Sequence, residues 1–166
     1  MNNLKVLLFL FLCSTYTYSI GQTILAQNIE PYNFGMFTLG GQSSGVLNLT
    51  ENSTLTTSQN ITVLNQSTIS AAKFLVTTTS VFPINVSIST SDVYLVNQFN
   101  ETILLQPELP NDESFNISVL NPLTVSLGAS LLISNNSPGH YNGDVEVMFI
   151  INSEWVKHYA LFHSKY

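Results

Sequence analysis

One stretch near the C-terminal end alternates strictly between apolar and other side chains, and it limits the fold more than any other feature of the chain. Over residues 144–151, one side of the backbone carries Val145, Val147, Phe149 and Ile151. A period of two is the pattern of a β-strand with one buried face. The turn-forming sequence PGHYNG at residues 138–143 precedes it. The pattern therefore predicts a strand over residues 144–151 that buries these four side chains in a core.

Three stretches further upstream show the same alternation and predict further strands. They are residues 72–78, with Phe74 facing inward, residues 82–89, with Phe82 facing inward, and residues 115–120, with Val119 facing inward. Gly128 lies between the apolar runs 123–127 and 131–133, and this spacing predicts a tight hairpin. Short strands separated by turn signals predict an all-β fold, an antiparallel sandwich or barrel.

The first residues have the pattern of a secretory signal peptide. Lys5 is followed by an unbroken apolar run over residues 6–12 and then by small residues up to Gly21. The run is too short to span a bilayer. We expect a signal peptide over residues 1–21, with cleavage after Gly21 or as late as Ala26, and a single domain over residues 22–152. Lipid attachment at Cys13 is disfavoured, because large apolar residues precede it.

The last segment, residues 153–166, differs from the rest. Trp155, Tyr159, Phe162 and Tyr166 recur at a helical spacing, among two Lys and two His residues. This spacing predicts a frayed tail or a short helix that rests on the domain. The alternative is an aromatic and basic patch that touches a partner or an anionic surface.

Composition excludes several classes of function. Charged residues make up 8% of the chain, Arg is absent, and the net charge is −6. Removal of the segment that carries Lys5 leaves three Lys against ten acidic residues. Nucleic-acid binding needs several basic side chains to neutralise phosphates, so we exclude it. The only cysteine is Cys13, so the secreted domain can form neither a disulfide framework nor a Cys-based zinc site.

No catalytic constellation is recognisable, and we expect a protein without enzymatic activity, cofactor or metal. The histidines are His140, His158 and His163. The last two are five residues apart, a spacing that does not bring both rings to one face of a helix. Asp144 and Glu146 share one face of the closing strand, but a glycosidase needs its second carboxylate across a cleft. Solvated residues that discourage edge pairing are the simpler interpretation.

Three stretches together resemble a family of exported bacterial domains, domain of unknown function 4402. They are NFGMF at residues 33–37, SAAKFLVT at residues 70–77, and LGASL at residues 127–131 with PGHYNG at residues 138–143. The resemblance covers about residues 29–152 and implies an exported, immunoglobulin-like β-sandwich, loosely akin to bacterial fimbrial subunits. It carries over no catalytic residue. The segment after Asn152 departs from the family pattern.

Tyr141, Gly139 and Gly143 are candidate structural residues at the entry to the closing strand, beside the core positions Phe74 and Val145. A Gly-x-Tyr sequence at a strand start resembles a tyrosine corner, in which the phenol hydrogen-bonds to nearby backbone. The alternative is an ordinary packed tyrosine.

The sequence favours a secreted, periplasmic or cell-surface protein with a structural or adhesive, fimbria-like role. Its partners would be further copies or other surface proteins, joined by strand pairing. Residues 22–30 are the candidate donor strand, and residues 141–151 or a neighbouring strand form the candidate acceptor edge. The extra residues 153–166 argue against a chaperone-assembled pilin, which would end with the closing strand.

The alternative function is a carbohydrate- or ligand-binding module. It needs a solvent-facing aromatic platform, for which Tyr32, Tyr94 and Phe99 are the candidates. We expect burial in the core for each of the three.

Overall fold

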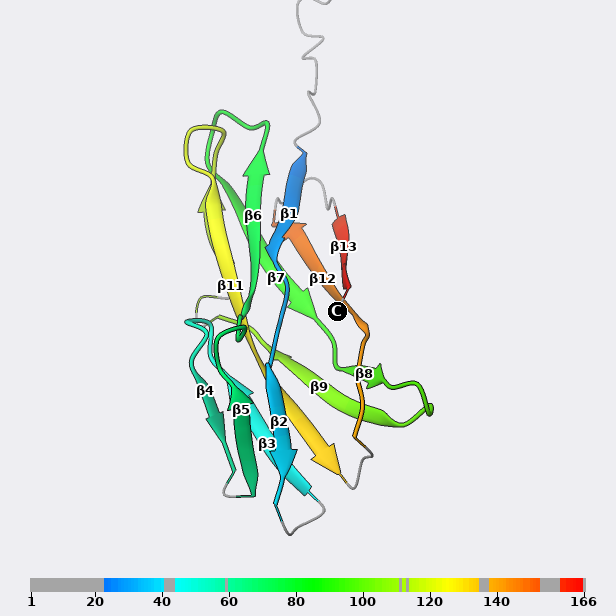
Figure 1. The fold of residues 1–166 in the computed structure, drawn as a ribbon. Helices are drawn as coiled ribbons and strands as arrows, with labels where there is room; N and C mark the ends of the chain where they lie inside the picture. The colour runs from blue at the N-terminus through cyan, green and yellow to red at the C-terminus, as the bar shows by residue number, and fades with distance from the viewer. Residues whose placement is uncertain are drawn as a thin grey trace, which may run out of the picture.

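The computed structural model describes residues 23–40, 44–58, 60–110, 112, 114–134 and 138–152, together with the backbone of residues 159–165. The expected signal peptide lies outside these residues. No helix occurs in the described part of the chain (Figure 1). Its strands are β1 (Ile24–Glu30), β2 (Met36–Leu39), β3 (Ser44–Leu49), β4 (Leu55–Thr57), β5 (Ile61–Asn65), β6 (Ala72–Thr78), β7 (Ile84–Thr90), β8 (Val93–Val96), β9 (Thr102–Glu108), β10 (Ser114–Ile117), β11 (Leu123–Ser134), β12 (Asp144–Ile151) and β13 (Tyr159–Lys165).

The described strands pair antiparallel in three sheets. The largest has seven strands and follows the order β1-β6-β11-β3-β4, with β9 also paired to β11 and β8 paired to β9. The second has the order β10-β7-β12-β13, and the third is the pair β2-β5.

One core lies between the two large sheets, so the predicted all-β sandwich is confirmed. Phe74 on β6 and Phe149 on β12 meet edge to face, with ring centroids 5.7 Å apart. Val145, Val147 and Phe149 are fully buried, as the alternation predicts. Edge-to-face aromatic contact adds to the free energy gained by burying both rings.

Strand β11 is the longest and joins most of the large sheet. Its first half pairs with β6, and residues 129–132 pair with β3 and β9 at the same time. The predicted hairpin at Gly128 is therefore wrong, because the strand runs straight through. A Cβ built on Gly128 would lie 2.7 Å from the backbone oxygen of Leu49, so this glycine permits close approach of backbone and makes no turn.

The predicted helix or frayed tail after residue 152 is also wrong over Tyr159–Lys165, where the chain forms β13. This strand pairs antiparallel with β12 from Ile150 opposite Tyr159 to Asp144 opposite Lys165. The helical spacing of the aromatic residues did not outweigh the unpaired backbone edge that β12 offers. Such an edge gains hydrogen bonds along its whole length when a strand of the same chain covers it.

Two predicted strands are shorter at one end than the alternation suggests. Strand β7 begins at Ile84, so Phe82 lies in the preceding turn and is exposed. Strand β10 ends at Ile117, so Val119 lies in the following turn and is half exposed. Both side chains were expected to face the core. The two turns that carry them lie at the upper end of the sandwich in Figure 1, where β6 ends and β11 begins.

Candidate binding surfaces

A cleft opens at the part of the sandwich where β1 leads into β2. Its volume is about 410 Å³. Buried side chains from β8, β9 and β11 line it, among them Leu95, Leu105 and Leu131. Two further segments line it, residues 31–35 together with Phe37, and residues 139–142. Aromatic and amide side chains therefore converge on an open cleft whose lining offers a small molecule both apolar contacts and hydrogen-bonding groups.

Residues 139–142 are held in place by the hairpin between β8 and β9. Asn97 is 6% exposed, and its amide donates hydrogen bonds to the Tyr141 hydroxyl and to Glu101 Oε2, each 3.0 Å long. Its Oδ1 accepts hydrogen bonds from the backbone N–H groups of Phe99 and Glu101. The Tyr141 hydroxyl in turn donates to Glu101 Oε2 over 3.2 Å. Asn97 thus organises the whole turn.

The hydrogen bonds to Asn97 and Glu101 give Tyr141 a structural role, and both partners are side chains some forty residues upstream. Sequence reasoning missed Asn97. The one signal for it was its place in the polar sequence NQFNE between two β-prone runs. Gly143 lies against Leu95, whose Cδ2 would be 2.7 Å from an added Cβ. A Cβ added to Gly139 would lie 3.5 Å from Asn97, which is an ordinary contact distance, so this position has room for a side chain.

The three candidate platform aromatics have different environments. Tyr32 is buried, as expected, and its hydroxyl donates a 2.8 Å hydrogen bond to the backbone oxygen of Gly128. Tyr94 and Phe99, which were expected in the core, are more than 60% exposed. Tyr94 lies on β8, where Leu95 alone turns fully inward, and Phe99 lies in the β8–β9 turn. These two are available to a ligand.

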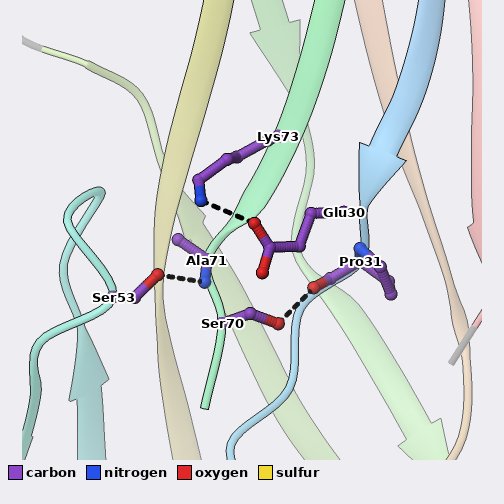
Figure 2. A network of polar contacts seen from close by, with 6 residues as sticks. All are labelled: Glu30, Pro31, Ser53, Ser70, Ala71 and Lys73. Carbon is purple, nitrogen blue, oxygen red and sulfur yellow. Dashed lines mark hydrogen bonds and ion pairs between the residues drawn. The ribbon is translucent and has the colours of Figure 1, made fainter. Parts of the chain in front are cut away.

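The candidate donor segment is already paired within the chain. Strand β1 lies at the edge of the large sheet and pairs with β6 from Ile24 opposite Thr78 to Asn28 opposite Phe74, with an irregularity before Glu30. At its end, Lys73 donates to Glu30, and the Ser70 hydroxyl donates to the backbone oxygen of Pro31 over 2.8 Å (Figure 2).

The same corner also fixes the β3–β4 turn. The hydroxyl of Ser53 accepts a 3.0 Å hydrogen bond from the backbone N–H of Ala71 (Figure 2). Lys73 and Glu30 are each more than one-third exposed, so their ion pair contributes less than about 1 kcal/mol. Strand β1 is consequently held by backbone pairing and by neutral hydrogen bonds more than by charge.

The candidate acceptor strand β12 lies between β7 and β13 and is not an edge. Its neighbour β13 ends the four-stranded sheet, and β1 lies beside it. A strand next to β12 is the other predicted acceptor edge, and β13 is the neighbouring strand that lies at an edge. Asp144 is exposed and Glu146 is partly exposed. In the pairing of β12 with β13, Asp144 lies opposite Lys165 and Glu146 lies opposite His163.

Within the described residues, no three His, Cys, Asp or Glu side chains gather as a metal site would require. His140 is exposed at the cleft. In the part of the chain that the structure describes, no helix is long and apolar enough to cross a bilayer.

Comparison with known proteins gives one match. A family model described as "Domain of unknown function (DUF4402)" matches residues 24–150, from the start of β1 almost to the end of β12. Searches of curated proteins and of solved structures found no match.

Proposed function

Because the chain belongs to the DUF4402 family of domains of unknown function, we propose that it is an exported, non-catalytic module with a structural or adhesive role at the cell surface. Copies join by exchanging an edge strand. One observation carries the proposal: the strands nearest the two ends of the described chain, β1 and β13, are both edge strands and lie beside each other.

The exchangeable strand is β13. It pairs with β12 over seven residues, and β12 separates it from the other strands of its sheet. If β13 of one copy pairs with β12 of another, every backbone hydrogen bond of the closed form is made again between copies. Strand β1 is less suited, because Ser70 and Lys73 hold its C-terminal end.

The test uses two differently tagged samples of residues 22–166, mixed at high concentration and separated by size-exclusion chromatography with light scattering. We expect mixed-tag dimers whose share rises with concentration. A monodisperse monomer that never acquires the second tag would contradict the proposal.

A locked variant provides the control. Glu146 and His163 are directly opposite in the β12–β13 register, so Glu146→Cys with His163→Cys places two thiols at a spacing that a disulfide can bridge. The protein after residue 13 contains no other cysteine. Oxidation should abolish exchange and reduction should restore it. Exchange that persists in the oxidised variant would rule out β13 as the exchanged strand.

Binding of a carbohydrate or another small ligand is the second candidate function, and the cleft favours it. Four aromatic residues line it together with Asn33, His140 and Asn142. A glycan array with residues 22–166 is the first measurement. Any binder should lose affinity at least about tenfold when His140 and Asn142 are both replaced by Ala, since two hydrogen-bonding groups are removed.

Tyr94→Ala is the matched variant for this candidate, because Tyr94 is exposed but does not line the cleft. It should leave binding in the cleft unchanged. An array without any binder above background would rule out carbohydrate as the ligand.

A further inference from the structure

Four apolar side chains project from the end of the sandwich at which β6 ends and β11 begins. They come from two turns, one between β6 and β7 and the other between β10 and β11 (Figure 1). Their exposed fractions are 67% for Val81, 79% for Phe82, 50% for Val119 and 85% for Leu120. We call these four residues the apolar tip. Isolated exposed apolar residues are common, but a group on two adjoining turns indicates a contact surface.

The two turns are fixed to each other and to the sheets. The backbone N–H of Val119 donates to the backbone oxygen of Ser80 over 2.8 Å. The Ser80 hydroxyl donates to the backbone oxygen of Phe82 over 2.7 Å, and the N–H of Ser80 donates to the Thr78 hydroxyl. Ser118 and Asn121 exchange two backbone hydrogen bonds within the second turn. The backbone of the tip is therefore held in a defined conformation, in which its four side chains are exposed.

Charge is missing from the segments that carry the tip. The sequence has no Asp, Glu, Lys, Arg or His between Lys73 and Asp92, which spans most of β6, the first turn and β7. It has none between Glu113 and His140 either, which spans β10, the second turn and β11. A partner that is recognised through charge does not fit these turns. An uncharged apolar phase does, because protruding Phe and Leu side chains gain free energy by leaving water.

The start of the described chain lies at this same end. The hydroxyls of Thr23 and Thr79 are 3.1 Å apart, and Thr79 comes two residues before Val81. The chain before Thr23 contains the apolar run of residues 6–12, which we expect to enter the membrane during export. Under the export that we propose, the end of the domain that carries Thr23 and the adjoining tip is the end that follows this run.

We propose that the apolar tip inserts into the surface of a lipid bilayer with electrically neutral headgroups and orients the sandwich end-on to the membrane. This contact goes beyond the proposed strand exchange and uses other residues. Phe82 and Leu120 contribute most, because they are the two largest and most exposed side chains of the tip. Attraction of this kind depends on apolar area and not on ionic strength.

Vesicle flotation tests the proposal with residues 22–166 and phosphatidylcholine vesicles. The unaltered protein should float with the vesicles to the same extent at low and high salt. Phe82→Ser with Leu120→Ser should lower vesicle affinity at least about tenfold, since two side chains that would be buried in lipid are lost. The matched control is Met36→Ser with Leu64→Ser, which removes two other exposed apolar side chains, on β2 and β5, and should leave vesicle affinity unchanged.

A second measurement does not depend on removing the tip. Because residues 22–166 contain no cysteine, Leu120→Cys can carry a single environment-sensitive fluorophore, with Leu64→Cys as its counterpart. Vesicles should shift the emission of the label at 120 to shorter wavelength and leave the label at 64 unchanged. Absence of flotation, equal flotation of the tip variant, or an unshifted label at 120 would each overturn the proposal. Loss of self-association in the tip variant, without vesicle binding by the unaltered protein, would assign the tip to a second copy instead.

Discussion

Phe74 lies at a direct contact between the two large sheets. It is 1% exposed on β6, and its ring meets that of Phe149 on β12. Phe74→Ala removes this contact and leaves a cavity between the sheets, so the free energy of unfolding should fall by about 3–5 kcal/mol. Chemical denaturation followed by circular dichroism measures the change. Leu64→Ala, at an exposed position, should cost less than about 0.5 kcal/mol, and similar costs at both sites would contradict the position of the core.

Gly128 allows a second substitution to be predicted from one distance. An added Cβ would lie 2.7 Å from the backbone oxygen of Leu49, and a backbone atom cannot move aside as the end of a side chain can. Gly128→Ala should therefore lower the free energy of unfolding by about 1–3 kcal/mol. The matched change Gly40→Ala meets its nearest atom at 3.7 Å. Denaturation midpoints that shift equally for both variants would show that close approach at Gly128 is not the reason for the glycine.

The β8–β9 hairpin is an element whose shape depends on one amide. Asn97 uses both side-chain atoms in four hydrogen bonds within the turn and to Tyr141. Asn97→Ala leaves the Phe99 and Glu101 N–H groups without this acceptor, so we expect a loss of about 2–3 kcal/mol, against about 1 kcal/mol for Tyr141→Phe. Denaturation of both single variants and of the double variant gives the coupling between the two residues. Additive losses would mean that the Asn97–Tyr141 hydrogen bond does not contribute.

Strands with a continuous apolar face could be predicted from the sequence, but their ends and the last strand could not. Alternation located β6 and β12 because burial of every second residue leaves a direct trace in the sequence. The alternation predicted β7 to begin too early and β10 to end too late, because Phe82 and Val119 continue the pattern of an apolar residue at every second position into the turns. Strand β13 was missed because residues 155, 159 and 162 also fit a helical period. The choice between helix and strand depends on the edge of β12, which β13 covers, and a contact between separate segments leaves no local pattern in the sequence.

As one body, the domain should unfold in a single transition that is insensitive to reducing agents. Side chains from both large sheets contribute to one core, and residues 22–166 contain no cysteine that could form a disulfide. Thermal unfolding followed by circular dichroism, with and without dithiothreitol, should give the same midpoint. Near-ultraviolet and far-ultraviolet signals should change together. Two separated transitions would mean that the sheets form independent units.

The candidate sites were less predictable than the fold. Tyr32 was correctly placed in the core, whereas Tyr94 and Phe99 were not, because exposure depends on which face of a short edge strand or turn a neighbour covers. The cleft joins residues from four stretches that no local pattern connects, namely residues 31–35 with 37, residues 95, 103 and 105, residue 131, and residues 139–142. The same holds for the apolar tip, whose two turns are almost forty residues apart.

The position of β11 also sets the order in which the molecule can form. This strand pairs with β3, and the contact between Ser130 and Asn48 closes a loop of 82 residues. The chain loses conformational entropy when so long a loop closes, and it does so before the core contacts that compensate for this loss have formed. Folding should therefore take milliseconds to seconds rather than microseconds. Until residue 134 has been added, β3, β6 and β9 lack their common partner, so the large sheet cannot be completed before most of the chain has been made.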